Sequence, residues 1–314
     1  SAQSATSLPS SGGMMLKDKD ILGLREMPAE EIDEILDVGM NMKKLLKQNI
    51  KKLPHLQGKS VTTLFYENST RTRCSLELPA KYMGAHVVNI SADSSSVKKG
   101  ETLVDTGKTL DAMKNDIIVI RHPMGGAPAL LAKTVKAHVV NAGDGMNEHP
   151  SQALLDMLTM RENFGSISGL KVAILGDISH SRVAKSNLFG LKKLGAEVTM
   201  YAPRTLIPTG IEMMGAKICR SREEAVEGAD VVMGLRLQRE RQHACNFPSL
   251  GEYSKFYGVS EALMKYAKKG ALVMHPGPVN RGVELTSGLI DGETSRIEEQ
   301  VLSGIAVRMA MLFL

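Results

Sequence analysis

Short apolar segments alternate with segments of helical periodicity through both halves of the chain. Strands are predicted at residues 61–66, 85–90, 117–120 and 138–141, and again at 172–175, 198–202, 231–235 and 271–274. Helices are predicted at residues 70–83, 101–114, 128–136, 150–163, 183–194, 223–227, 260–268 and 297–313. Because strands that alternate with helices form parallel sheets with right-handed crossovers, the chain is predicted to have an α/β fold.

The pattern starts again after residues 164–169, a segment of glycine, serine, phenylalanine and isoleucine. Two similar domains are therefore predicted, each a parallel sheet flanked by helices, with the active site between them. Ligands of such sheets bind beyond the carboxyl ends of the strands, so chemistry is expected in the segments that follow the strands. The length of 314 residues agrees with two domains, because it exceeds what one hydrophobic core usually supports.

An earlier helix is predicted to begin after Pro28, where proline suits the first turn. Its apolar residues share one face: Ile32, Ile35, Leu36, Met42, Leu45 and Leu46. Acidic residues stand at its start, and lysines, including Lys43, are expected on its polar side near the end, as the helix dipole favours. This helix is predicted to be purely structural.

The composition narrows the class of ligand. The net charge of +5 comes from dispersed basic residues, and aromatic residues, 4% of the chain, do not interleave with them as they do in single-strand-binding proteins. We therefore expect small anionic substrates and neither nucleic acid nor membrane as a partner. No apolar run approaches the roughly 20 residues of a membrane span.

The three cysteines, Cys74, Cys219 and Cys245, are widely spaced and form no C-x-x-C pair. Neither a disulfide framework nor a zinc site is predicted, and a cytoplasmic location fits this use of cysteine. Residues 1–13 are small and polar and lack the basic start and apolar middle of a secretory signal, so a disordered tail is expected there.

The strand at 61–66 leads into a segment with the features of an anion site, Ser-Thr-Arg-Thr-Arg at 69–73. The first turn of the following helix offers unpaired backbone N–H groups and the positive end of the helix dipole. The hydroxyls of Ser69, Thr70 and Thr72 add donors, and Arg71 adds a planar guanidinium. Phosphate suits this site. Taken alone, such a segment is more often a helix cap beside surface arginines.

Two further polar segments follow strands of the first half. Arg121 comes directly after the strand at 117–120, and His149 precedes Pro150 at the start of a predicted helix. A residue before proline is held extended, so the His149 ring is expected to project into the crevice, with Gln152 beside it in the first turn. By itself, a histidine in this position is more often a cap or a surface residue.

The second half also carries polar residues after its strands. Gly176 follows the strand at 172–175 without the other glycines of a G-x-G-x-x-G fingerprint, so nicotinamide binding is disfavoured. Arg236 and Gln238 are alternate residues beyond the strand at 231–235, so both side chains can face one ligand. The alternative interpretation is a cluster of charged residues exposed to solvent. The elbow His-Pro-Gly-Pro at 275–278 presents carbonyls that can accept from a substrate amide.

Six segments in this order resemble the aspartate/ornithine carbamoyltransferase family, and its aspartate branch closely, over residues 59–313. They are Ser-Thr-Arg-Thr-Arg at 69–73, Lys-Lys-Gly-Glu-Thr at 98–102, Arg-His-Pro at 121–123, His-Pro-Ser-Gln at 149–152, Arg-Leu-Gln-Arg-Glu-Arg at 236–241 and His-Pro-Gly-Pro at 275–278. With all six present, ligand binding replaces the capping and surface interpretations of these segments. Structural roles are retained for His86, His122, His138, His243 and the three cysteines.

The resemblance implies transfer of the carbamoyl group of carbamoyl phosphate to the amine of L-aspartate, which gives N-carbamoyl-L-aspartate and phosphate in pyrimidine biosynthesis. The implied carbamoyl phosphate site is Ser69, Thr70, Arg71, Thr72, Ser95, Lys99, Arg121, His149, Gln152, Pro276 and Gly277. The implied catalytic residues are Arg71, Thr72, Lys99, Arg121 and His149, and the implied aspartate site is Lys99, Arg182, Arg236 and Gln238. No metal or organic cofactor is implied, because the protein mainly positions and neutralises two anions.

The resemblance also implies domain boundaries and an assembly. A carbamoyl-phosphate-binding domain would comprise residues 14–150 plus 297–314, and an aspartate-binding domain residues 151–296. The loop at 91–100, which carries Ser95 and Lys99, has no apolar anchor, and in the family it crosses to the next subunit. A homotrimer with shared active sites is therefore expected, with a regulatory chain or a pathway enzyme left open as a further partner.

Two alternatives stay open. A carbamoyltransferase for ornithine or another amino acid would have to place a cationic side chain beside the arginines of residues 236–241, which would repel it. The ornithine branch also typically carries cysteine where this chain has Pro276. A non-catalytic anion-binding protein of this fold would be expected to lack some of the catalytic residues named above, and all of them are present.

Two positions depart from the family pattern. Pro79 lies inside the helix predicted at 70–83, where it removes a hydrogen bond to the carbonyl of Ser75 and is expected to interrupt and kink the helix. Gly277 stands where relatives often carry leucine or alanine, which raises the question of how the elbow is held.

Overall fold

The fold is described by a computed structural model that covers residues 20–67, 70–91, 102–144, 148–178, 181–203, 206–208, 210–237, 258–277 and 279–313, without the side chains of residues 70–72. The chain divides into two compact units, Ser1–Leu154 with Leu302–Leu314, and Leu155–Val301. Helices α6 (Pro150–Phe164) and α12 (Ile297–Phe313) each include a boundary between the units.

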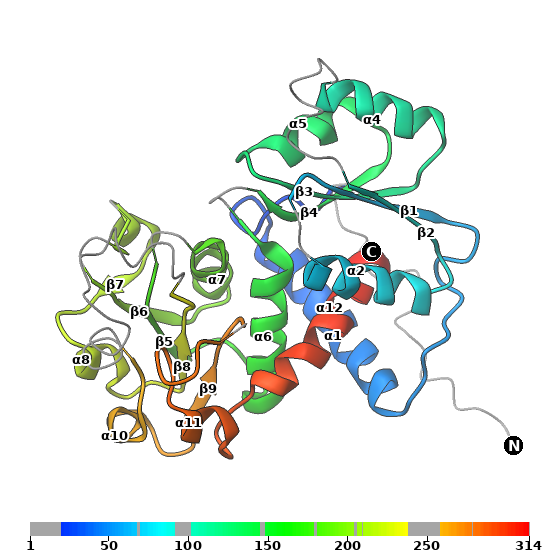
Figure 1. The fold of residues 1–314 in the computed structure, drawn as a ribbon. Helices are drawn as coiled ribbons and strands as arrows, with labels where there is room; N and C mark the ends of the chain where they lie inside the picture. The colour runs from blue at the N-terminus through cyan, green and yellow to red at the C-terminus, as the bar shows by residue number, and fades with distance from the viewer. Residues whose placement is uncertain are drawn as a thin grey trace, which may run out of the picture. The chain divides into compact units, whose positions relative to one another are not determined.

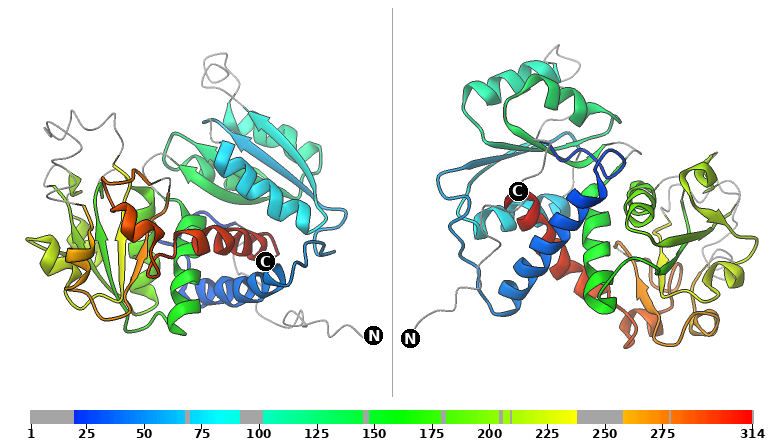
Figure 2. Two further views of the ribbon diagram at one scale, coloured as in Figure 1. Left: turned by 60° about the horizontal axis from the view of Figure 1, so that its bottom comes forward. Right: turned by 180° about the vertical axis from the view of Figure 1, so that it is seen from behind.

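The first unit is built on a parallel sheet in the order β2-β1-β3-β4. Its strands are β1 (Ser60–Phe65), β2 (His86–Ser91), β3 (Ile117–His122) and β4 (His138–Asp144), and its remaining helices are α1 (Ala29–Lys47), α2 (Thr70–Tyr82), α4 (Leu103–Ala112) and α5 (Ala127–Thr134). Helices α4 and α5 cover one face of this sheet, and α1, α2 and α12 lie on the other (Figures 1 and 2).

The side chains of the central strands explain why both faces are covered. On one face, Leu64, Ile118 and Ile120 are fully buried with Leu110 of α4 and Leu131 of α5. Alternate residues of the same strands, such as Val61 and Val119, point to the opposite face and are buried as well. Strand β2 differs because it lies at the edge of the sheet, where only Val87 and Ile90 are partly buried.

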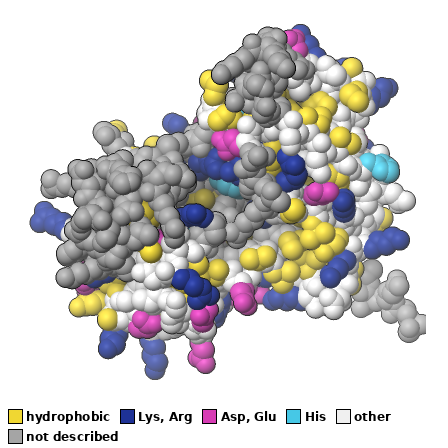
Figure 3. Space-filling model, viewed as in Figure 1, with side chains coloured by type: hydrophobic (Ala, Val, Ile, Leu, Met, Phe, Trp, Pro, Cys, Tyr) yellow, Lys and Arg dark blue, Asp and Glu magenta, His cyan; other side chains and the backbone are white. Residues whose placement is uncertain are grey.

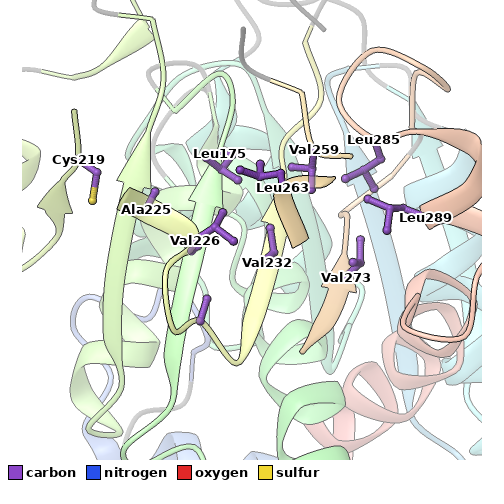
Figure 4. Close-up of a cluster of buried hydrophobic side chains, with 12 residues drawn as sticks. Leu175, Cys219, Ala225, Val226, Val232, Val259, Leu263, Val273, Leu285 and Leu289 are labelled. Carbon is purple, nitrogen blue, oxygen red and sulfur yellow. The ribbon is translucent and has the colours of Figure 1, made fainter. Parts of the chain in front are cut away.

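The second unit has a five-stranded parallel sheet in the order β7-β6-β5-β8-β9. Its strands are β5 (Lys171–Leu175), β6 (Glu197–Tyr201), β7 (Lys217–Ile218), β8 (Val231–Gly234) and β9 (Leu272–Met274). Its helices are α7 (Arg182–Lys193), the short 3₁₀ helix η2 (Ile211–Met214), α8 (Arg222–Val226), α10 (Glu261–Met264) and α11 (Ser287–Asp291). Figure 4 shows a buried apolar cluster of this unit, in which Leu175, Val232 and Val273 of the sheet lie near Leu263 and Leu289 of the helices.

The predicted α/β fold with two parallel sheets is confirmed. The predicted helix 297–313 coincides with α12, and the other predicted strands and helices are present with shifts at their ends. The sequence pattern missed β7, η2 and α11, which are too short to show periodicity. No helix among the described residues is both long enough and apolar enough to cross a membrane.

The expected interruption of α2 and the expected position of Lys43 on the polar side of α1 were wrong. Helix α2 continues without interruption through Pro79, whose side chain is buried. Lys43 does not lie on a solvated face of α1: it is 1% exposed, and its Nζ donates to Ser303 Oγ of α12 at 2.7 Å. The long stem of the lysine is buried, and a hydroxyl far along the chain accepts a hydrogen bond from its ammonium group.

Gly107 gives a test of the packing of α4 on α5. A Cβ atom at Gly107 would lie 2.6 Å from Leu131 Cδ1 and 2.9 Å from Val135 Cγ1, closer than packed carbon atoms can come. The replacement Gly107→Ala should therefore lower the free energy of unfolding in urea by about 1 to 2 kcal/mol, even though alanine favours a helix by about 1 kcal/mol.

The control for this variant is Lys108→Ala, at an exposed position of the same helix, which should change stability by less than about 0.5 kcal/mol. A stabilised Gly107→Ala protein would mean that α4 and α5 are not packed this closely.

Candidate functional site

The sheet of the first unit contains a topological switch point between β1 and β3. The chain leaves β1 toward α2 on one face and leaves β3 toward α5 on the other (Figure 1). Ligands of open α/β sheets bind in the crevice that forms at such a point. The two strands stay paired to this edge, where Tyr66 N donates to the carbonyl of Arg121 at 2.9 Å. Of the predicted residues of the first unit, residues 69–72 come after β1 in the chain, and Arg121 lies near the end of β3, not after it as predicted. His149 and Gln152 come after β4, the neighbour of β3.

Helix α2 begins at Thr70, as the phosphate-site prediction requires. The backbone N–H groups of a first helical turn have no partners within the helix, which favours an anion at the start of α2. Ser69 and the side chains of Thr70, Arg71 and Thr72 lie outside the described residues. Arg73 makes contacts of another kind, since it donates to Ser91 Oγ of β2 and its guanidinium lies 5.5 Å from the centre of the Phe65 ring.

Arg121 forms an ion pair with Glu67, an acid to which the sequence gave no role. Its Nε donates to Glu67 Oε2 at 3.2 Å, and the two side chains are 13% and 32% exposed. This ion pair fixes the direction of the guanidinium and brings a carboxylate close to the predicted phosphate site. Glu67 could have been suspected from the sequence because it stands directly between a strand and the predicted site.

His149 lies just before α6 and is only 9% exposed. Its Nδ1 lies 3.4 Å from Ser151 Oγ, and its carbonyl accepts from Ala153 N at 3.4 Å, so both the ring and the backbone are tied to the first turn of the helix. Gln152 is half-buried in the same turn.

A buried network supports the chain that leads to His149. Asp144, at the end of β4, accepts hydrogen bonds through Oδ1 from Asn141 Nδ2 at 3.0 Å and from Glu148 N at 3.2 Å. Its Oδ2 accepts from Gly126 N at 2.9 Å, in the turn that follows β3. Glu148 in turn accepts from Leu24 N at 2.7 Å. The Gly-Asp-Gly pattern at 143–145 was the only signal of this network in the sequence.

His122 fits the structural role predicted for it. Its Nδ1 accepts from Met124 N at 3.0 Å, and its ring packs on Tyr66 with the ring centres 4.7 Å apart. Burial lowers the pKa of the imidazole, and the charges of Glu67 and Asp144 oppose that shift in part. A neutral ring that accepts a backbone hydrogen bond stabilises the turn after β3.

In the second unit, β5 and β8 frame the corresponding switch point. Arg182 is the first residue of α7, which follows β5, and Arg236 follows β8 with its side chain exposed. Gly176 explains how the two strand ends come together: its φ is +129°, and a Cβ atom there would lie 3.0 Å from the carbonyl oxygen of Leu235. The glycine therefore allows the ends of β5 and β8 to pack closely.

The elbow at 275–277, which follows β9, is held by a hydrogen bond to the buried ring of His275. Pro276 and Gly277 are half-buried, and Gly277 has a φ of +68°, which a residue with a side chain rarely adopts. Gly277 N donates to Nδ1 of the buried His275 ring at 2.8 Å. The departure from the family pattern at Gly277 therefore matches a left-handed backbone conformation and a fixed turn.

The remaining predicted ligand residues, Ser95, Lys99 and Gln238, lie outside the described part of the chain. Of the predicted ligand residues, the structure thus describes the side chains of Arg121, His149, Gln152, Arg182, Arg236 and Pro276, together with Gly277. Sequence reasoning gave no role to Glu67, Asp144, Glu148, Asn280 or Glu284. Glu67, Glu148 and Asn280 each have a partner more than 40 residues away, whereas His275 is only nine residues from Glu284.

Family models match both halves of the chain. The model of the aspartate/ornithine carbamoyltransferase carbamoyl-P binding domain matches residues 19–162, and that of the Asp/Orn binding domain matches residues 168–314. The chain is also 62% identical over 301 residues to the aspartate carbamoyltransferase catalytic subunit of Ruminiclostridium cellulolyticum, with 96% of each chain covered.

Solved structures of this family have the same fold as this chain. The aspartate transcarbamoylase of Trypanosoma cruzi in complex with N-(phosphonacetyl)-L-aspartic acid superposes with a TM-score of 0.83 at 32% identity, covering 95% of this chain and 96% of the other. The ornithine carbamoyltransferase of Pyrococcus furiosus superposes with a TM-score of 0.82 at 30% identity, covering 93% and 95%. The fold is therefore common to both branches, and the chain belongs to the aspartate/ornithine carbamoyltransferase family.

Proposed function

We propose that this chain transfers the carbamoyl group of carbamoyl phosphate to the amine of L-aspartate, giving N-carbamoyl-L-aspartate and phosphate for pyrimidine biosynthesis. The observation that carries the proposal is the identity of 62% and 61%, over 96% of the chain, with relatives named aspartate carbamoyltransferase catalytic subunits. A cytoplasmic location is part of the proposal and fits the free Cys74 and Cys219.

Carbamoyl phosphate is proposed to bind mainly to the first unit. Its phosphate would lie at the start of α2, with Ser69, Thr70, Arg71 and Thr72 as donors and with Ser95 and Lys99 from a neighbouring subunit. The position of α2 after β1 supports this, because the first helical turn presents backbone N–H groups to an anion. The carbamoyl amide would be held by Gln152 and by the carbonyl of Pro276 in the elbow that includes Gly277.

The carbonyl oxygen of the carbamoyl group is proposed to face Thr72, Arg121 and His149. The aspartate amine attacks the carbonyl carbon, and a C–N bond forms. The bond from carbon to the phosphate oxygen then breaks, and phosphate leaves with that electron pair and with the proton that the amine gives up. Negative charge develops on the carbonyl oxygen in between, so donors already aimed at it stabilise the transition state more than the bound substrate. The ion pair of Arg121 with Glu67 supports this role because it fixes the guanidinium before the substrate arrives.

Aspartate is proposed to bind through its two carboxylates to Arg182, Arg236, Gln238 and Lys99. Arg182 and Arg236 flank the switch point of the second sheet, which supports their assignment to one ligand. We accordingly assign carbamoyl phosphate binding to residues 14–150 with 297–314, and aspartate binding to residues 151–296.

The assay that tests the proposed function compares amino-acid acceptors. Incubation with carbamoyl phosphate and L-aspartate should release phosphate and form carbamoyl aspartate, whereas L-ornithine should give no more phosphate than a reaction without an acceptor. The reason is the cationic character of the acceptor site, which attracts a second carboxylate and repels a second ammonium group. Preferential turnover of ornithine would reverse the assignment of Arg236.

Arg121 and His149 are expected to act in the transition state. Arg121→Ala should lower kcat much more than it raises the KM for carbamoyl phosphate, and His149→Ala should lower kcat by about ten- to a thousandfold, the range for one oxyanion donor. Steady-state kinetics with each substrate varied in turn gives both constants. The control is Lys81→Ala, which removes an exposed cation of α2 that pairs with Glu77. A rise in KM alone would show that these residues only bind the substrate.

We also propose a homotrimer with shared active sites. The described residues of the first unit support it, because β2 is the last described strand on its side of the sheet and its Val88 is 51% exposed. Figure 3 shows hydrophobic side chains exposed on this unit over the region of α1 and α2, and Leu78 of α2 is 39% exposed. Exposed strand edges are usually covered by another element or another chain.

A mixing experiment distinguishes shared sites from sites within one chain. Lys99→Ala and Arg121→Ala should each be nearly inactive, and after dissociation, mixing and reassembly each mixed closed trimer should regain one complete site, about a third of the wild-type activity. Each variant reassembled alone is the control. Mixed trimers that form and stay as inactive as their parents would place Lys99 and Arg121 in the same chain's site.

A further inference from the structure

A buried histidine and glutamate lie behind the elbow of the second unit. His275 Nε2 lies 3.1 Å from Glu284 Oε1, and the two side chains are 0% and 2% exposed. A carboxylate this deeply buried is costly unless it receives hydrogen bonds. An apolar pair of similar size would fill the same space at lower cost, so the pair is expected to serve more than packing.

The hydrogen bonds determine where the ring proton lies. The backbone N–H of Gly277 can only donate, and it points at His275 Nδ1 from 2.8 Å, so Nδ1 accepts and carries no proton. The ring proton therefore lies on Nε2, which donates to Glu284 Oε1. Glu284 thus fixes the tautomer, and the tautomer makes the bond to Gly277 possible.

This bond also sets the direction of a carbonyl group. The N–H of Gly277 and the C=O of Pro276 belong to the same planar peptide unit, in which the two groups point in opposite directions when the bond is trans. Because the N–H is directed at the buried ring, the Pro276 carbonyl is directed away from it. That carbonyl is the group proposed above to accept from the carbamoyl amide.

The same glutamate is connected to the segment that carries Arg236. Its Oε1 accepts from Asn280 N at 3.3 Å and from Asn280 Nδ2 at 3.4 Å. Asn280 Nδ2 also donates to the carbonyl of Leu237 at 2.9 Å. Leu237 lies between Arg236 and Gln238, the two residues of this segment proposed to bind aspartate.

We propose that His275, Glu284 and Asn280 are positioning residues for the two substrates. His275 orients the Pro276 carbonyl toward carbamoyl phosphate, Asn280 holds the strand end that presents Arg236 to aspartate, and Glu284 links the two. This inference rests on the proposed function. It adds that each branch of the network serves one substrate: a defect at His275 impairs the use of carbamoyl phosphate, and a defect at Asn280 impairs the use of aspartate.

Three variants test this assignment of substrates to the two branches, and a fourth is a control. Asparagine places its side-chain oxygen where histidine has Nδ1, so His275→Asn keeps an acceptor for Gly277, whereas His275→Gln keeps only a donor near Glu284. Asn280→Ala removes the bond to Leu237. Ser221→Ala is the control for general destabilisation of this unit, because Ser221 Oγ accepts from Glu224 N at the start of α8, away from the network.

Each branch of the network is expected to raise the Michaelis constant of one substrate when it is broken. His275→Gln should raise the KM for carbamoyl phosphate by about tenfold, the effect of losing one well-placed hydrogen bond, with a smaller change for aspartate. His275→Asn should recover most of this loss. Asn280→Ala should raise the KM for aspartate by about tenfold and leave that for carbamoyl phosphate nearly unchanged. Ser221→Ala should change neither constant, and the thermal midpoint of each variant is measured alongside.

Equal changes in both constants, in proportion to the loss of thermal stability, would show that the network is merely structural and would overturn the inference. Unchanged kinetics in folded His275→Gln and Asn280→Ala would overturn it as well. If the His275 variants do not fold, the two Michaelis constants of Asn280→Ala, a change at a half-buried position, are sufficient to test the inference. A wild-type protein that forms no carbamoyl aspartate would refute the proposed function itself, an outcome distinct from an active enzyme without the split.

Discussion

The backbone that leaves a parallel strand loses its sheet hydrogen bonds at the place where ligands bind. Those polar groups need other partners when they are buried, and an enzyme that acts by positioning needs them to be rigid. In the first unit Asp144 meets this need, since its carboxylate accepts from the turn after β3 and from the chain before His149. In the second unit Glu284 does so through His275 and Asn280.

These carboxylates relate the fold to the proposed chemistry. Carbamoyl transfer needs no covalent intermediate with the protein, so rate enhancement depends on donors and acceptors that are in place before charge develops. Arg121 is directed by Glu67, and the Pro276 elbow is directed by the ring beneath it. Gly277 and Gly176 contribute by adopting positive φ angles where a side chain would strain or block the turn.

The sequence was sufficient for the fold class and for the places where chemistry is expected. Apolar segments alternating with helical periodicity reveal a parallel sheet, and polar residues at strand ends then fall at one edge of it. Partners separated by long stretches of chain carry no such signal: Glu67 and Arg121 are 54 residues apart, and Lys43 and Ser303 are 260 apart. Elements of two to five residues, such as β7 and α11, bury too few side chains to leave a periodic pattern.

Groups fixed at the strand ends of both units are proposed to bind two anionic substrates. A crystal structure with N-(phosphonacetyl)-L-aspartic acid, which a structural relative binds, tests this most directly. We expect the phosphonate at the first turn of α2, the acetyl oxygen within hydrogen-bonding distance of Arg121 and His149, the Pro276 carbonyl directed at the ligand, and the aspartate carboxylates on Arg182 and Arg236. A ligand bound without Arg121 and the start of α2, or a Pro276 carbonyl that turns toward His275, would contradict this arrangement.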